Sequence, residues 1–234
     1  MILLRPACER GHAEHGGLDS WHSFSFGGYH DPGHVHWGPL RVINEARIDA
    51  GRDFGRHGHR DMEIINYVLD GALGQRDSMG NSACIVPGDV QRMSAGSGVI
   101  HSEFNHAPSG RTHFLQIWIL PAVQGLPPSY EQTHFDAADR RGRLRRIVSP
   151  DGRDGSVRIH QDACLYSGLF DGDERAELSL APGRLGYVHV ARGEAVVDGY
   201  PLGAGDALRY RAQRSISIGQ GRAAEVLVFD LPVR

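Results

Sequence analysis

Short apolar runs separated by glycine and proline constrain the fold of this chain more than any other feature. Runs rich in Val, Ile, Leu, Tyr and Phe recur along the sequence, for example at 40–44, 63–69, 82–88 and 113–120. Glycine (31 residues) and proline (12 residues) separate them, and no stretch of a dozen residues has a clean 3.6-residue apolar period. Short strands joined by turns are typical of an all-β sandwich or barrel, so we expect little helix.

The composition changes in the segment 122–146. This segment is first rich in proline and then becomes polar and arginine-rich, with ADRRGRLRR near its end. Such composition is typical of a connection that runs over the surface. The chain, at 234 residues, has room for two domains of about 100 residues each. We therefore predict two packed β-barrel lobes, with an N-terminal domain at 1–121, a linker at 122–146 and a C-terminal domain at 147–234.

Charge and composition exclude several classes of function. The net charge is −3, so nothing favours binding to nucleic acid or to a membrane surface. All 25 basic residues are arginine, which excludes Schiff-base and pyridoxal chemistry because both need a lysine amine. The apolar runs are too short to cross a bilayer, and the N-terminus lacks the apolar core of a signal peptide.

The three cysteines indicate a reducing compartment. Cys8, Cys84 and Cys164 lie far apart and form no CxxC pair. An odd and scattered set argues against a disulfide framework and against a thiolate metal cluster. We expect the protein to be cytoplasmic.

Histidine is the informative residue type, because 11 of the 14 histidines fall between His12 and His113. His57 and His59 stand two apart in a strand-like run, where such side chains share one face about 6.6 Å apart. His101 and Glu103 repeat this spacing after a glycine-rich turn. Two such pairs on neighbouring strands would bring four ligands to one interior point. Three imidazoles and a carboxylate suit Fe(II), Mn(II), Ni(II), Cu(II) or Zn(II).

Other side chains are weaker candidates. Three histidines could surround the metal site or line a pocket, with a surface or hydrogen-bonded role as the alternative: His22, His106 and His113. Three aromatic residues could wall a pocket, although aromatic residues more often form core: Trp21, Phe24 and Phe26. His160 and His189 are isolated in the second half, and we expect neither to bind metal.

The order of these motifs resembles that of a known family. HGH at 57–59, PGD at 87–89 and GSGVIHSEFN at 96–105 resemble the two cupin motifs. Together with WHSFSF at 21–26, they more closely resemble the pirin-like proteins, bicupins that include bacterial quercetin 2,3-dioxygenases. The resemblance extends over nearly the whole chain and is most specific in the first 121 residues. It implies a bicupin whose C-terminal barrel lacks metal ligands.

Carried over residue by residue, the resemblance places the family's metal ligands on His57, His59, His101 and Glu103. It leaves Glu63 outside the ligand set. One divalent cation per chain is implied. Fe(II) is the expected ion, with Ni, Mn, Cu, Zn and Co as alternatives.

The activity implied by the resemblance is oxidative cleavage of a flavonol heterocycle by dioxygen, with release of carbon monoxide. The metal would act as a Lewis acid, and Glu103 would be the catalytic proton acceptor. A metal-binding regulator that acts through a protein partner is the alternative, since it needs the same four ligands. Another cupin reaction, such as an isomerisation, is a third. Oxygen uptake with a flavonol would separate the dioxygenase from the regulator and from the other cupin reactions. We expect the protein to be a monomer.

Overall fold

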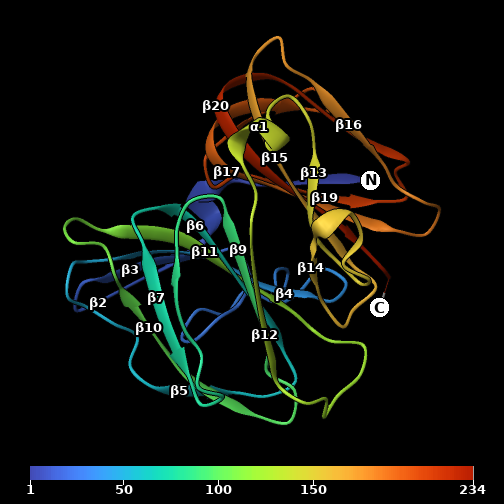
Figure 1. Ribbon diagram of the computed structural model, residues 1–234. Helices are drawn as coiled ribbons and strands as arrows, with labels where there is room; N and C mark the ends of the chain where they lie inside the picture. The colour runs from blue at the N-terminus through green and yellow to red at the C-terminus, as the bar shows by residue number, and fades with distance from the viewer. Residues whose placement is uncertain (234) are drawn as a thin grey trace.

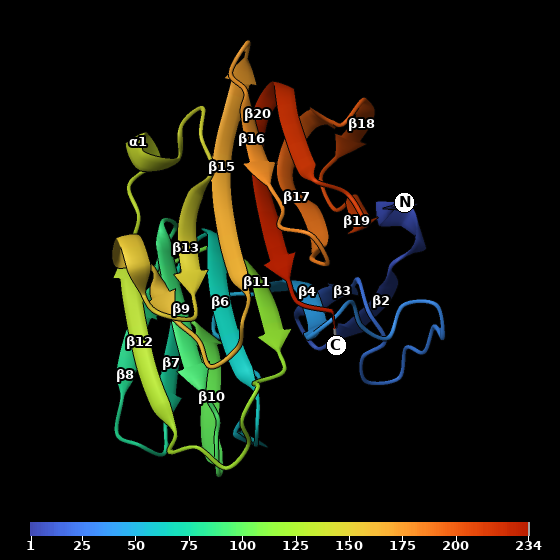
Figure 2. The same cartoon turned by 90° about the vertical axis from the view of Figure 1, so that its right-hand side faces the viewer.

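Three β-sheets make up almost the whole molecule. The computed structural model describes residues 1–233, and its sheets form two lobes packed against each other (Figure 1 and Figure 2). Within that range α1 (Ala137–Arg140) is the only α-helix, beside two single 3₁₀ turns, η1 (Ala7–Glu9) and η2 (Arg153–Gly155). The predicted all-β bicupin with little helix is confirmed. No helix in the described range is long and apolar enough to span a membrane.

The N-terminal lobe is a sandwich of two antiparallel sheets. The larger sheet has seven strands, in the order β12 (Ser129–His134), β9 (Asp89–Ser94), β6 (Glu63–Asp70), β11 (Thr112–Ile119), β4 (Leu40–Ile48), β3 (Leu18–His22) and β2 (Gly11–His15). The smaller sheet has four strands, in the order β5 (His57–His59), β10 (Val99–Asn105), β7 (Leu73–Asp77) and β8 (Ser82–Ile85). The two sheets face each other, and the space between them is the interior of this lobe.

The C-terminal lobe is one nine-stranded sheet rolled around its own core. Its strands follow the order β1 (Ile2–Arg5), β19 (Ala207–Arg211), β17 (Leu185–Val197), β20 (Ser215–Leu231), β15 (Cys164–Gly172), β13 (Arg145–Ser149) and β14 (Val157–Arg158), with β16 (Ala176–Ser179) beside β20 and β18 (Tyr200–Gly203) beside β17. Register shifts interrupt the pairing of β17 with β20. Such bulges bend a strand and increase its twist, which lets these two long strands curl around the core.

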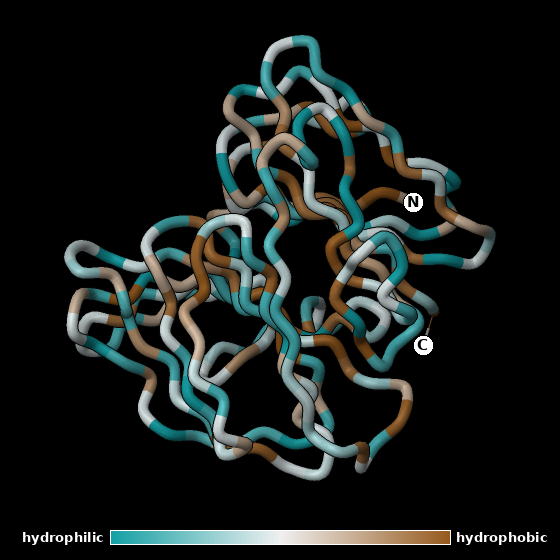
Figure 3. The backbone as a smooth tube through the Cα atoms, viewed as in Figure 1, coloured by the Kyte–Doolittle hydropathy of each residue, from teal (hydrophilic) through white to brown (hydrophobic). Residues whose placement is uncertain are grey.

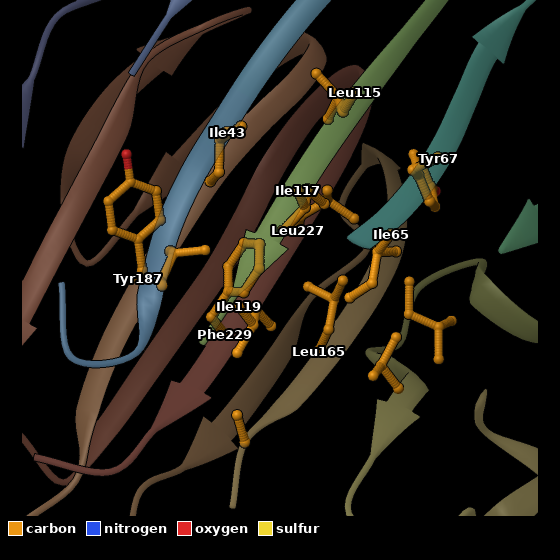
Figure 4. Close-up of a cluster of buried hydrophobic side chains, with 14 of the residues drawn as sticks. Ile43, Ile65, Tyr67, Leu115, Ile117, Ile119, Leu165, Tyr187, Leu227 and Phe229 are labelled. Atoms are coloured by element: carbon orange, nitrogen blue, oxygen red, sulfur yellow. The ribbon is translucent and has the colours of Figure 1, made fainter. Parts of the chain in front are cut away.

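The main hydrophobic core lies between the lobes rather than inside either one. Alternate residues of β11, Leu115 and Ile117, face the C-terminal lobe, where Leu227 and Phe229 of β20 meet them. Figure 4 shows these side chains gathered between the strands of the two lobes. Each fully buried side chain of this size contributes about 1.5–3 kcal/mol relative to exposure. Hydrophobic stretches follow the strands towards the centre, and most loops are hydrophilic or neutral (Figure 3). The interface therefore fixes how the two lobes are held together.

Two strands pair with sheets outside the regions to which the sequence assigned them. β12 lies within 122–146 and adds an edge strand to the N-terminal sheet by pairing with β9. β1 lies at the start of the chain and pairs with β19 of the C-terminal sheet. The division into 1–121, 122–146 and 147–234 stays our proposal, with these two strands as the ties between its parts.

Candidate metal centre

Strands β5 and β10 bring three histidines together inside the N-terminal lobe. In their antiparallel register His57 is paired with His101, and His59 with Val99. Alternate residues of a strand share a face, so His57, His59 and His101 all point inward. One ligand nitrogen from each lies within 4.8 Å of the other two. The pairing predicted from the i, i+2 spacing of histidines is therefore present.

The distances between the imidazole nitrogens fit a divalent metal ion. Nε2 of His101 lies 2.9 Å from Nε2 of His57 and 3.0 Å from Nε2 of His59. Two nitrogens bound at about 2.1 Å and at a right angle lie about 3.0 Å apart. Nδ1 of His57 donates to the carbonyl oxygen of Gly55, which leaves the Nε2 lone pair directed at the centre. A proton can bridge only one of these contacts, whereas one cation satisfies all three nitrogens.

Burial keeps two of the imidazoles neutral. Burial, with a smaller contribution from the neighbouring histidines, lowers the pKa of His59 to about 4 and that of His101 to about 3. Desolvation penalises the charged ring, so at neutral pH both rings are in the form that binds metal. Each of these two neutral rings therefore has one nitrogen lone pair that a metal ion can use.

Glu103 lies beside the triad, fully buried and fixed by two amides. Asn66 Nδ2 donates to its Oε1 (2.5 Å) and Gln116 Nε2 donates to its Oε2 (2.7 Å). Oε2 is 4.0 Å from Nε2 of His101. Burial raises the pKa of Glu103, and the two amide donors oppose that rise. Each carboxylate oxygen has two acceptor sites, so both hydrogen bonds leave room for a metal ion.

A cavity of about 590 Å³ opens onto the triad. His57, His59 and Glu103 line one part of it. Four aromatic side chains form much of the remaining wall: Phe26, Phe54, Phe114 and Trp118. A cavity of this size with apolar walls and a few polar groups is typical of a small-molecule site. A flat aromatic molecule would fit its walls.

Two family models match the chain. The pirin model matches residues 4–119, and the model described as the quercetinase C-terminal cupin domain matches residues 146–231. A protein named quercetin 2,3-dioxygenase from Escherichia coli K12 is 45% identical over 232 residues, which are 99% of each chain. The chain belongs to the pirin family. A second relative, named pirin-like protein and from Caulobacter vibrioides, is 38% identical over 98% of this chain and 99% of its own.

Solved structures of the family share the fold over its full length. The bacterial pirin YhhW from Escherichia coli, in complex with nickel(II), superposes with a TM-score of 0.94. It is 44% identical, and the match covers 100% of both chains. The oxalate decarboxylase of Lactobacillus farciminis, at 13% identity and a TM-score of 0.67, shares the fold alone.

The three histidines that the sequence suggested near the metal site or in a pocket, His22, His106 and His113, lie in different surroundings. His22 is buried and lines the cavity. His106 is exposed and lies outside the cavity, with its ring 5.8 Å from that of Phe104. His113 also lies outside it and is hydrogen-bonded to Glu45 (Nε2 to Oε1, 2.9 Å). Only His22 can therefore meet a molecule bound in the cavity.

The aromatic candidates are divided in the same way. Phe26 lines the cavity, and its ring lies 5.4 Å from that of Trp118. Phe24 belongs to the core between the lobes. Trp21 stacks on His12 with their ring centroids 4.8 Å apart.

Glu63, His160 and His189 lie outside the group of converging ligands. Glu63 accepts from Ser94 Oγ (2.7 Å), and its other oxygen is 3.1 Å from Nδ1 of His160. This contact crosses from the N-terminal sheet to the C-terminal half of the chain. His189 is fully buried on β17. Neither His160 nor His189 therefore lies among the converging imidazoles.

Sequence reasoning missed part of the cavity wall on β11. Phe114, Gln116 and Trp118 face the cavity, while the residues between them face the other lobe. Trp118 Nε1 donates to Gln116 Oε1 (3.1 Å), so the tryptophan fixes the amide that holds Glu103. The available signal was the nearly continuous apolar run HFLQIWIL, which is typical of a strand whose two faces are both covered.

Proposed function

We propose that this protein is a metal-dependent dioxygenase that cleaves the heterocycle of a flavonol. The observation that carries the proposal is the aromatic-walled cavity lined by His57, His59 and the buried carboxylate of Glu103, with His101 directly behind the first two. The names of the relatives support the same reaction class. A cytoplasmic location and a monomeric state stay predictions from the sequence.

The metal would be held by His57, His59, His101 and Glu103. The contacts among the three imidazoles fit such an ion, and the carboxylate reduces the net charge of a divalent site to +1. A nickel(II) complex of the YhhW relative supports a divalent ion, and Fe(II) stays the ion expected from the sequence. When bound, the ion supplies Lewis acidity and a template for an anionic oxygen.

The cavity residues would orient the flavonol and exclude water. Phe26 and Trp118 present flat apolar surfaces near His59, whose ring lies 5.0 Å from that of Trp118. Exclusion of water strengthens the electrostatic interactions of the reacting oxygen. The 3-hydroxyl of the flavonol would therefore be directed to the polar end of the cavity.

Glu103 would accept the proton of that hydroxyl at Oε2. The amides of Asn66 and Gln116 keep its carboxylate in one orientation, which favours transfer over a fixed short distance. In the overall reaction both atoms of dioxygen enter the organic product. Both links between carbon 3 and its neighbouring ring carbons break. Carbon 3 then leaves with the 3-oxygen as carbon monoxide.

The direct test measures oxygen uptake and loss of flavonol absorbance. Protein loaded separately with Fe(II), Ni(II), Mn(II) or Zn(II) receives quercetin, and turnover with at least one ion is expected. Uptake with none of them would reject the dioxygenase proposal and favour the regulator that acts through a protein partner.

Glu103→Gln tests the proton step. Its amide oxygen can still bind the metal but cannot accept a proton at neutral pH, so turnover should fall at least a hundredfold, and by more than metal content. The new NH₂ group also faces an amide donor, because Asn66 and Gln116 both donate to Glu103. The swap Glu103→Gln with Gln116→Glu is the matched control, since it restores one carboxylate–amide pair. Turnover of E103Q at the wild-type rate would reduce Glu103 to a ligand.

A further inference from the structure

A second polar group lies in the cavity, two strands away from Gln116, one of the two residues that hold Glu103. His22 of β3 is paired with Asn44 of β4, and Asn44 with Gln116 of β11. All three side chains line the cavity. Neighbouring strands lie about 4.8 Å apart, which separates the backbone of His22 from that of Gln116 by about 10 Å. The cavity thus has one polar end at Glu103 and another at His22.

Asn44 determines which nitrogen of His22 carries the proton. Nδ1 of His22 lies 2.9 Å from Oδ1 of Asn44. An amide oxygen only accepts, so Nδ1 is the protonated nitrogen and Nε2 keeps its lone pair. Burial lowers the pKa of His22, which keeps the ring neutral. Nε2 is therefore a hydrogen-bond acceptor at neutral pH.

The protein satisfies this acceptor poorly. Its contact is Ser20 Oγ at 3.4 Å, a long distance for such a bond, and that hydroxyl also lies 3.5 Å from the carbonyl oxygen of Ala13. The His22 side chain is only 4% exposed, and its ring lies 5.2 Å from that of Phe26. A buried acceptor in apolar surroundings gains most from a donor that enters the cavity. A phenolic hydroxyl is such a donor.

We propose that His22, oriented by Asn44, accepts a hydrogen bond from a hydroxyl on the pendant ring of the substrate, remote from the metal-binding oxygen. The inference rests on the proposed function. It narrows the substrate class to flavonols hydroxylated on the pendant ring, since a molecule without that group leaves Nε2 unpaired. His22 is thus a residue that determines specificity.

The test compares quercetin, which has two hydroxyls on its pendant ring, with galangin, which has none there. Dissociation constants are measured without oxygen on the metal-loaded protein, by quenching of tryptophan fluorescence, because Trp118 lines the cavity. The wild type should prefer quercetin roughly tenfold, the usual effect of one hydrogen bond to a buried group. His22→Phe should abolish this preference by weakening quercetin binding alone.

Two further variants complete the design. His22→Gln retains an acceptor oxygen and should keep part of the preference, which a general loss of packing would not allow. His106→Phe is the matched control, because His106 is exposed and lies outside the cavity. It should bind both flavonols as the wild type does.

The outcomes separate this inference from the proposed function. If H22F loses the preference for quercetin over galangin and the wild type takes up no oxygen, the role of His22 is supported and the dioxygenase proposal is rejected. Turnover with equal affinity for the two flavonols in the wild type overturns the inference and leaves the dioxygenase in place. An undiminished preference in H22F also overturns it.

Discussion

The interiors of the two lobes differ in how many polar side chains they bury, although both lobes are built mainly from antiparallel strands. In the N-terminal lobe the buried residues on the inward face of β10 are Val99, His101, Glu103 and Asn105, three of them polar, and Gln75 of β7 is paired with Glu103 and also buried. In the C-terminal lobe the inward-facing residues are apolar throughout, for example Val188 of β17 and Val226 of β20. The first barrel therefore encloses a candidate site beside smaller apolar clusters, whereas the second encloses one larger apolar core.

This difference shows how a duplicated architecture divides its tasks. A polar interior with a cavity contributes little hydrophobic stabilisation, because open space and unpaired polar groups both cost free energy. The apolar C-terminal interior and the core between the lobes supply what the site does not. Among residues 1–233 the converging imidazoles all come from the first barrel, and the second barrel supports it through the shared core.

The largest expected effect is the loss of metal from one lobe only. His57→Ala or His101→Ala should remove most bound metal, because each opens the coordination shell. Elemental analysis of protein purified without chelators or affinity tags measures this. His160→Ala and His189→Ala are the controls in the C-terminal half and should leave metal content unchanged. If either control halves the metal content, a second site exists and the comparison of the lobes fails.

The next effect concerns stability. Phe170 is fully buried inside the C-terminal lobe, so Phe170→Ala should lower the free energy of unfolding by about 3–5 kcal/mol. Phe54 is only partly buried and lines the cavity. Phe54→Ala should cost about 1 kcal/mol, since less contact is lost there. Urea unfolding of both variants measures the contrast. Equal losses would show that the cavity wall is packed like a core.

The smallest expected effect is a change in pH dependence. His189 is fully buried without a hydrogen-bond partner for either ring nitrogen in residues 1–233, and burial lowers its pKa to about 3. The unfolded chain binds the proton near pH 6.5, so unfolding takes up a proton between pH 6.5 and 3. Stability should fall as the pH falls through this range, by about 1.4 kcal/mol per pH unit from this residue.

His189→Leu should remove that contribution. The free energy of unfolding of the metal-free protein is measured in urea at pH 7, 6 and 5, for H189L and for the wild type. His59 and His101 contribute equally to both proteins, so their contribution cancels in the difference. His106→Gln, at an exposed position, should retain the wild-type slope. If H189L also retains it, the buried ring does not exchange its proton on unfolding.

The sequence predicted the features that depend on local patterns. Period-two alternation and turn residues are local, so the all-β fold and the shared face of His57 and His59 could be predicted without knowing any strand partner. The different surroundings of His22, which is buried in the cavity wall, and of the exposed His106 could not be predicted, because both are histidines next to strand-like runs. Their difference depends on register: His22 faces Asn44 across a strand pair, whereas His106 follows the end of β10.

Local sequence patterns also could not predict which distant segments pair with each other. β12 resembles a polar connection in composition, and it becomes a strand because the edge of β9 is available to it. The contact between Glu63 and His160 joins residues 97 positions apart, which no spacing rule connects. Propensity describes a segment, but strand partners are chosen by the whole fold.

The pairing of β1 with β19 has a consequence for the order of events during synthesis. The four residues of β1 emerge from the ribosome long before their partner on the sheet, which spans Ala207–Arg211. At about 5–20 residues per second, they wait on the order of 10–40 s for it. Through that interval the apolar start of the chain, with Leu3 and Leu4, has no sheet to join. The sheet of the C-terminal lobe can therefore gain β1 only after β19, about 200 residues later, has been synthesised.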